Sequence, residues 1–373
     1  MSGIVERAYT SADLPHLRQL WGRVYEPEAA SRREAAYRWI TERNPLCPAG
    51  APRHLAFDAD RLVGSLGRMP IRWRAGGHPF EMHWSHDLLV DPACRGRGLG
   101  KILVQAVARD APSMAGGLWM TDACCRLHVS AGWKEVRPFR PQRLILDGGA
   151  ALRRRVRSPL LAGVLAPAAR AWIGVFGRRP GPPSRPIRDV DAFGRGTDAL
   201  FERVAARLGC IAERTHAYLN WKYVDTPHLR YGKVMVGDPA APEGYAVWRT
   251  DRKADGRVNG LIVDLLADPA VEGAFDSAVS AAVARLAAEG AQVVTCLVTH
   301  APFRARLAAA GFSPGSHLHT FVITAETRVP IDGDPFDAAS WYLTAGDSDG
   351  DMWSTAQAWA IGRQQTLPTR PSS

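Results

Sequence analysis

The sequence lacks the features that would place it in a membrane or in an oxidising compartment. No run of about 18 or more uncharged apolar residues occurs, and segment 1–7 carries no apolar signal-peptide core. The six cysteines show no Cys-x-x-Cys pair and no histidine partner at zinc spacing. We therefore expect a cytoplasmic protein with reduced thiols and no structural metal.

Acidic residues are missing from one long stretch. Segment 151–188 contains nine arginines and no Asp or Glu, so it supplies +9 of the net charge of +10. We expect no nucleic-acid partner, because a basic footprint confined to one segment is not a basic groove or a recognition helix. Pro159 and Pro167 are expected to interrupt any continuous helix. The simpler interpretation is a proline-broken linker over 149–185; the alternative is peripheral docking of 151–179 on an anionic membrane.

Glycine is concentrated at one strand-to-helix turn. Residues 84–90 predict a strand, and residues 99–109 place apolar side chains at helical spacing. The start of a helix leaves backbone N–H groups unpaired and carries the positive end of the helix dipole, which suits a phosphate. Glycines clear space for a bulky anion and cations add charge. The glycines are Gly96, Gly98 and Gly100, and the cations are Arg95, Arg97 and Lys101.

The spacing of this turn fits neither a P-loop nor a dinucleotide fingerprint. It resembles motif A of the GNAT N-acetyltransferase superfamily, Arg/Gln-x-x-Gly-x-Gly/Ala, which stands here as Arg95-Gly96-Arg97-Gly98-Leu99-Gly100. The resemblance implies that these residues and Lys101 hold the pyrophosphate of the co-substrate acetyl-CoA. It also implies that the preceding strand, Leu88-Leu89-Val90, bonds the pantetheine arm through its backbone.

The chain also repeats itself beyond the linker. Segment 87–93 returns as 264–270, and Tyr37 and Trp39 return as Tyr218 and Trp221. The order of elements in roughly the first 148 residues resembles the GNAT fold, so the fold class implied is α/β (α+β), with two mixed-sheet domains in tandem. The expected ranges are a catalytic domain at 1–148, the linker at 149–185, a degenerate domain at 186–330 and an extension at 331–373.

The two copies differ at the glycine turn. Opposite segment 95–100 the second copy has 272–277, which sets Glu272 against Arg95 and fills two of the glycine positions. A glutamate facing a pyrophosphate is repulsive. The second copy is therefore expected to keep the fold without the cofactor site.

Catalysis on an amine needs a base, because an alkylammonium is mostly protonated at neutral pH. The resemblance implies a base on the strand before the turn, where His86 stands and the second copy has Val263. His83 and Asp87 are reserves if a bulge shifts the register. Many family members have a tyrosine four residues before the position of Gly132, to give a proton to the CoA thiolate.

In this chain that position is His128, which becomes the candidate proton donor. Nucleophilic transfer through Cys124 or Cys125 is a further alternative. These residues predict an N-acetyltransferase that acylates a primary amine directly in a ternary complex. Two alternatives remain open: an acyl-CoA-binding regulator or scaffold without turnover, and an aminoacyl-transferase of the tandem GNAT-like kind. The acceptor, the acyl chain length and the oligomeric state also remain open.

Overall fold

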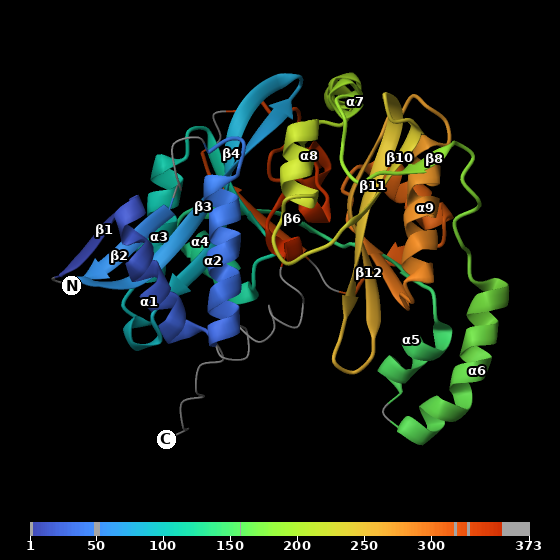
Figure 1. Cartoon of the computed structure of the whole chain (residues 1–373), viewed down its shortest axis with the longest axis horizontal. Coiled ribbons are helices and arrows are strands. Elements are labelled where there is room, and N and C mark those ends of the chain that lie inside the picture. The colour runs from blue at the N-terminus through green and yellow to red at the C-terminus, as the bar shows by residue number, and fades with distance from the viewer. Residues whose placement is uncertain (1–2, 48–52, 157, 317–318, 327–328, 353–373) are drawn as a thin grey trace.

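Two mixed sheets stand side by side in the molecule, each with helices packed against it (Figure 1). The computed structural model describes residues 3–47, 53–156, 158–316, 319–326 and 329–352. We call the sheet nearer the N-terminus sheet A and the other sheet B. Sheet A with helices α1 to α4 forms the first copy of the fold, and sheet B with α7 to α10 forms the second.

Sheet A runs in the order β1-β2-β3-β4-β5-β15-β6, and β9 and β16 extend it from β3. Only the pairs β4–β5 and β9–β16 are parallel in the described part of this sheet. Its strands are β1 (Ile4–Ala8), β2 (Arg53–Asp58), β3 (Arg61–Ala75), β4 (His78–Val90), β5 (Met114–Leu118), β6 (Trp133–Phe139), β9 (Cys210–Ala212), β15 (His319–Thr324) and β16 (Trp341–Tyr342).

Sheet B runs in the order β14-β7-β13-β12-β11-β10-β8. Its strands are β7 (Gln142–Ile145), β8 (Ile187–Asp189), β10 (Gly232–Asp238), β11 (Ala241–Arg252), β12 (Val258–Ala267), β13 (Val293–Cys296) and β14 (Ser313–Pro314). The helices are α1 (Leu14–Val24), α2 (Pro27–Glu42), α3 (Leu99–Asp110), α4 (Asp122–Ser130), α5 (Gly148–Arg155), α6 (Pro159–Phe176), α7 (Gly196–Val204), α8 (His216–Tyr223), α9 (Ala274–Ala288) and α10 (Ala301–Ala309).

Alternation along the strands of sheet A assigns successive side chains to opposite faces. On one face, Leu55 and Leu89 pack with Leu17 and Trp21 of α1 and with Tyr37 of α2. On the other face, the buried residues of α3 pack with those of the strands and of α4; they include Ala56, Leu66, Leu103, Val107 and Cys125. The turn between β4 and α3 therefore follows a strand whose two faces are covered by helices, and it precedes a helix that packs on the sheet.

The two copies exchange strands. β15, from the C-terminal half, lies between β5 and β6 of sheet A, with Phe321 opposite both Leu118 and Val136. β7, from the N-terminal half, lies between β13 and β14 of sheet B, with Leu144 opposite Val294. Each sheet is therefore completed by a strand of the other half, and the division between the sheets does not follow the expected boundary at residue 148. The ranges 1–148 and 186–330 stay a prediction about folding units.

One expectation about local structure is wrong. The linker is not broken at Pro167, because α6 runs through it from Pro159 to Phe176. Proline removes one helix hydrogen bond, and the lost partner carbonyl belongs to the exposed Gly163, where water can reach it. In the part of the chain that the structure describes, no helix has the length and apolarity needed to span a membrane.

Candidate functional site

The glycine turn has the backbone conformation that the sequence predicts. Gly96 and Gly98 have φ angles of +80° and +79°, in the left-handed region that favours glycine, and Gly98 is the N-cap of α3. A Cβ at either glycine would meet no heavy atom within 4 Å. The turn is therefore open on the side that its two glycines present.

Several amide groups of the turn have no acceptor. The N–H groups of Cys94 and Arg95 donate to Asp91 and Pro92, and those of Lys101 and Ile102 donate to the Gly98 carbonyl. Between them, the N–H groups of residues 96–100 donate to no acceptor in the described residues. Five neighbouring N–H donors at a helix start are an arrangement that suits an anion, and the cofactor-binding role expected of residues 95–101 stays a prediction.

Gly100 has a different role from the other two glycines. A Cβ there would lie 2.8 Å from Cδ2 of Leu127, so this glycine allows close packing of α3 on α4. Gly100 therefore has a packing role, and its contact with the cofactor, which stays a prediction, would come from its N–H group.

The three cations of the turn are not equivalent. Arg97 Nη1 lies 2.6 Å from Asp58 Oδ2, so this guanidinium is tied to the turn between β2 and β3. Arg95 and Lys101 are exposed and form no ion pair in the described part of the chain. Arg95 and Lys101 are therefore the two charges of the turn that can reach an anion without first breaking a contact.

The strand before the turn separates from its neighbour. β4 and β5 pair in parallel from Met82–Met114 to Trp84–Gly116, and no further pair joins them although β4 continues to Val90. Beyond the register shift, Leu89 and Val90 pair with β3 on the other side only. This leaves one edge of β4 open beside the glycine turn, as the expected pantetheine contact requires.

A bulge interrupts β4 at the reserve residue Asp87. The register against β3 shifts between Ser65 and Gly67, and Asp87 has a φ of +53°. Its carboxylate accepts from Arg33 Nη1 at 2.9 Å and Arg53 Nη2 at 3.4 Å. In the second copy the corresponding Asp264 is also buried against an arginine, with Arg214 Nε 3.3 Å from its Oδ1. Asp87 is therefore a structural anchor, and it is not available as a base.

His86 is buried on the face of sheet A that α2 covers. Its ring lies directly against Gly67, where a Cβ would collide with it, and Nε2 has no hydrogen-bond partner in the described residues. Burial, together with the charges of Arg53 and Arg33, lowers the pKa of His86 to about 3. The imidazole is therefore neutral at pH 7, and in this environment its basicity is low.

His128 is buried on the opposite face, in α4. Its Nδ1 lies 2.8 Å from the carbonyl oxygen of Cys124, and its Nε2 lies 3.0 Å from Oγ of Ser85. A carbonyl only accepts, so Nδ1 carries the proton and Nε2 accepts from the Ser85 hydroxyl in the neutral ring. Burial lowers the pKa of His128 to about 4, although the bond to Cys124 opposes this shift.

The two histidines are therefore not brought together. They lie on opposite sides of β4, and Ser85 and His86 are consecutive residues that point to opposite faces. Ser85 is a candidate site residue that the sequence does not point to. In the structure it holds the first position after β4 and β5 separate, on the face that α4 covers. His83, the other reserve, bonds Glu81 and lies away from the turn.

Cys124 contacts a histidine, with its Sγ 3.7 Å from His128 Nδ1, but its thiol is not activated. Burial and the neighbouring Cys125 raise the pKa of the Cys124 thiol to about 12, so it stays protonated at neutral pH. All six cysteines are free thiols. The described residues also hold no group of three or more His, Cys, Asp or Glu side chains that could bind a metal ion.

The corresponding turn of the second copy is shorter. Gly273 is the N-cap of α9 with a φ of +77°, so it matches Gly98, whereas the sequence comparison had set it against Gly96. Between the shared Asp-Pro-Ala and the capping glycine the second copy has two residues and the first has four. The second copy has therefore lost a piece of the turn, and the expectation that its glycines were only filled is wrong.

The chain itself covers the site in the second copy. The backbone N–H groups of Ser184 and Arg185 both donate to Ser277 Oγ at 3.1 Å, and a Cβ at Gly273 would collide with Ser184. These linker residues lie over the first turn of α9. The place that an anion would take at this helix start is therefore occupied.

In the second copy, residues of the C-terminal extension lie where strands β12 and β13 separate. β12 and β13 pair as far as Ile262–Cys296, and beyond that point Thr344 bridges Val298 while its hydroxyl donates to Asp264. Tyr342 donates to the Leu265 carbonyl. Segment 342–347 therefore lies beside β12 at the place that corresponds to the open edge of β4 in the first copy.

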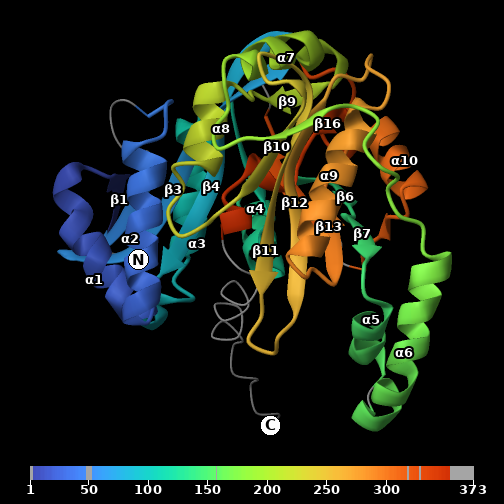
Figure 2. The same cartoon turned by 45° about the vertical axis from the view of Figure 1, so that its right-hand side comes forward.

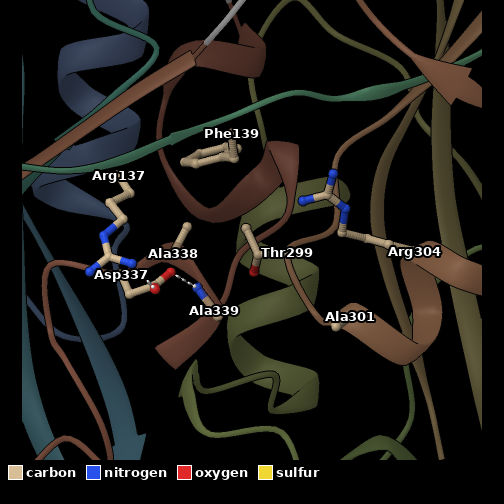
Figure 3. A pocket seen from close by; sticks show the side chains of 8 residues that line it. All are labelled: Arg137, Phe139, Thr299, Ala301, Arg304, Asp337, Ala338 and Ala339. Atoms are coloured by element: carbon tan, nitrogen blue, oxygen red, sulfur yellow. Dashed lines mark hydrogen bonds and ion pairs between the residues drawn. The ribbon is translucent and has the colours of Figure 1, made fainter.

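A hollow between the copies lies away from this site (Figure 3). Arg137 and Phe139 of β6 line one side, Thr299 and Arg304 the other, and Asp337 holds Arg137 at 2.9 Å. None of these residues belongs to the glycine turn or to β4. The hollow therefore has no part in the site described above.

Comparisons with known proteins agree with this geometry. Residues 6–118 match the family described as Acetyltransferase (GNAT) domain. No curated protein sequence matches the chain. A GCN5-related N-acetyltransferase from Anabaena variabilis has a similar structure, with a TM-score of 0.58 and 14% identity over 86% of this chain and 72% of that one.

Two further solved structures share the fold. One is a probable N-acyltransferase from Enterococcus faecalis, with a TM-score of 0.56 and 10% identity over 87% of this chain and 72% of that one. The other is Saccharomyces cerevisiae N-myristoyltransferase with bound myristoyl-CoA, with a TM-score of 0.53 and 13% identity over 87% of this chain and 83% of that one. Residues 6–118 of the first copy therefore match a GNAT acetyltransferase domain, and the fold of these solved N-acyltransferases extends over both copies in tandem.

Proposed function

We propose that this chain transfers an acetyl group from acetyl-CoA to a primary amine, with CoA bound at the first copy. The observation that carries the proposal is the run of unpaired amide groups at residues 96–100 beside the open edge of β4. Those donors fit the pyrophosphate, Arg95 and Lys101 add charge, and the β4 edge at residues 88–90 fits the amide groups of pantetheine. Leu99 anchors the helix start beneath them, since its side chain is buried.

The transfer itself is a direct displacement. The amine loses a proton and attacks the thioester carbon; the C–N bond forms, the C–S bond breaks, and its electron pair leaves with the sulfur as CoA thiolate. Two protons need a place: one leaves the attacking nitrogen, and one can neutralise the thiolate. We propose His86 and His128 for these two tasks.

His86 is the proposed acceptor of the amine proton. Its free Nε2 and its place on β4, nine residues before Arg95, support this role. Its low pKa means that it is ready to accept at any pH above about 3, but that it holds the proton weakly. A bound acceptor that brings a negative charge close to His86 would raise this pKa and improve the base.

His128 is proposed to act on the thiolate through Ser85. In the neutral ring Nε2 carries no proton, so a hydrogen bond to the sulfur has to come from the Ser85 hydroxyl, after it turns away from Nε2. Only an imidazolium could pass a full proton to the sulfur through Ser85. With a pKa of about 4, that form is scarce at neutral pH, so we propose stabilisation of the thiolate as the main contribution.

The low basicity of both histidines also favours a second candidate, an acyl-CoA-binding regulator without turnover. Such a protein needs the glycine turn and the β4 edge, and it needs neither histidine. An aminoacyl-transferase, the third possibility, would not use acetyl-CoA at all.

Thiol release from acetyl-CoA over a panel of amines, amino sugars and peptide N-termini separates these functions. We expect release with at least one amine, and a loss of kcat in Ser85→Ala and in His86→Ala with the affinity for acetyl-CoA retained. Binding of acetyl-CoA without release on any acceptor would support the regulator. Absence of acetyl-CoA binding would contradict both of these functions and leave the aminoacyl-transferase to be tested with charged tRNA.

A further inference from the structure

Helices α5 and α6 form a hairpin that projects from the side of sheet B in both views (Figures 1 and 2). The hairpin follows directly from β7, and Asp147 caps α5 by accepting from the N–H group of Ala150. The two helices meet through small residues. Gly148 lies against the backbone of Ala169, and a Cβ at Gly149 would be 2.9 Å from the carbonyl oxygen of Ala166.

The packing of α6 is inverted relative to an ordinary surface helix. Its face toward α5 carries Ala162 and Ala166, which are both 2% exposed. Its large apolar side chains point the other way, with exposed fractions of 84% for Leu160, 76% for Val164 and 74% for Val175. Leu161, Leu165 and Trp172 belong to the same stripe, with exposed fractions of 51%, 41% and 63%.

These six positions fall within roughly 140° of arc at about 100° per residue, so they form one continuous face. Most of the large exposed apolar side chains of the described chain are on this single helix. A soluble surface rarely gathers them in this way without a partner. We call these six residues the outward face of α6.

The charge around the outward face is of one sign. No Asp or Glu occurs from residue 151 to residue 188, and nine arginines do. Arg153 on α5 and Arg178 just after α6 are exposed at the two ends of the hairpin. Among the hairpin arginines whose side chains are described, only Arg170 forms an ion pair, with Asp147 at 3.2 Å.

We propose that the α5–α6 hairpin docks this protein on an anionic lipid surface, with the outward face in the acyl and headgroup boundary and the arginines on the phosphates. A second copy of the chain would bury the apolar stripe equally well, but it would bring two +9 segments together. An acidic bilayer satisfies both features at once. The inference does not depend on the acyl transfer proposed above.

Flotation of the full-length protein with lipid vesicles tests the proposal. Vesicles of phosphatidylcholine with about one third phosphatidylglycerol should carry the protein at low salt, and vesicles of phosphatidylcholine alone should carry at least about tenfold less. Salt at about 0.5 M should weaken the binding, because it screens the arginines.

Two variants separate the apolar and the charged contributions. Leu160→Ser/Val164→Ser/Val175→Ser should reduce partitioning by about tenfold or more, whereas Val5→Ser/Val129→Ser/Val224→Ser changes three exposed apolar residues elsewhere and should not. Arg153→Gln/Arg178→Gln should reduce it by a similar factor, and Arg126→Gln/Arg230→Gln, which removes two exposed arginines away from the hairpin, should have little effect.

Each variant should keep its native circular dichroism because the side chains that it changes are exposed, and acetyl-CoA binding by calorimetry is the independent readout of the site. Equal partitioning of the α6 variant and its control would overturn the proposal. So would sedimentation showing a dimer that the α6 variant dissociates, together with no binding to anionic vesicles. Loss of vesicle binding with acetyl-CoA affinity unchanged would support it.

Discussion

The indole rings of Trp39 and Trp221 stack with their centroids 4.3 Å apart and their planes 9° from parallel. Each ring also donates to the other's backbone: Trp39 Nε1 lies 2.8 Å from the Trp221 carbonyl, and Trp221 Nε1 lies 3.1 Å from the Trp39 carbonyl. The two residues are the repeated tryptophans of α2 and α8. The contact is therefore reciprocal, and it joins the two copies through equivalent positions.

The Trp39–Trp221 contact should show strong coupling in a double-mutant cycle. Trp39→Phe keeps an aromatic ring but removes a donor and leaves a buried carbonyl unpaired, so we expect a loss of about 1–3 kcal/mol in the free energy of unfolding. Trp221→Phe should cost a similar amount, and the double variant less than the sum. Denaturant unfolding measures the cycle.

Trp21→Phe is the matched control, because Trp21 is buried and its indole nitrogen has no hydrogen-bond partner in the described residues. Its effect should add to that of Trp39→Phe. Additivity in the Trp39–Trp221 cycle as well would contradict the reciprocal bonding.

The exchanged strands predict that the first copy is not stable by itself. A fragment ending at residue 148 lacks β15, so the edges of β5 and β6 that flank Phe321 are left unpaired. We expect this fragment to aggregate or to melt without cooperativity, and co-expression with residues 149–373 to restore a soluble complex. A cooperative thermal transition of the fragment alone, measured by circular dichroism, would show that the exchange is dispensable.

The extension should be held by a buried ion pair. Lys222 Nζ lies 3.2 Å from Asp351 Oδ1 and 2.5 Å from the Ser348 carbonyl, and both side chains are fully buried. Lys222→Met leaves the carboxylate without its cation, so we expect a loss of about 3–5 kcal/mol of unfolding free energy and earlier proteolysis of the extension. The exposed pair Arg137–Asp337 is the control, since Asp337→Asn should cost less than about 1 kcal/mol. Equal effects would contradict the anchoring role.

Acid should destabilise the protein through its buried neutral histidines. His128 has a folded pKa of about 4, whereas an unfolded histidine has one of about 6.5, so the unfolded chain binds more protons between these values. The stability is complete above pH 6.5 and falls as the pH is lowered toward 4, by on the order of 3 kcal/mol for this group.

His128→Gln should therefore flatten the dependence of unfolding free energy on pH in this window, and the exposed His78→Gln should not. Urea unfolding at a series of pH values measures both. A slope that is unchanged in His128→Gln would mean that His128 titrates normally in the folded protein.

The features that were predicted from the sequence are those that depend on short local patterns of residues. The turn at residues 95–101, the order of the elements in the first copy and the repeat of Trp39 as Trp221 all follow from spacing and glycine positions. The strand partners did not follow, because the pattern of a strand such as residues 319–324 records which face is buried and not which neighbours it pairs with.

The site was also only partly predictable. His86 was found by its distance from the glycine turn and His128 by its distance from Gly132, but their opposite sides of β4 depend on α4 packing His128 against Ser85. Ser85 was missed because a lone serine in a strand has no sequence signal. Ser184 and segment 342–347 cover the corresponding place in the second copy. These contacts join residues far apart in the chain, so neither stretch of sequence predicts them alone.

Acetyl-CoA titration by calorimetry tests the central claim, that amide groups of the first copy's turn bind the diphosphate. Gly96→Glu places a bulky acid in the turn, and Gly256→Glu is its control, with a φ of +79° against +80° and the same open space around the added side chain. The backbone strain is matched, so it cannot explain a difference. We predict that Gly96→Glu weakens binding by about tenfold or more through charge repulsion while Gly256→Glu binds like the unaltered protein. Equal affinity of the two variants would contradict the assignment of the site.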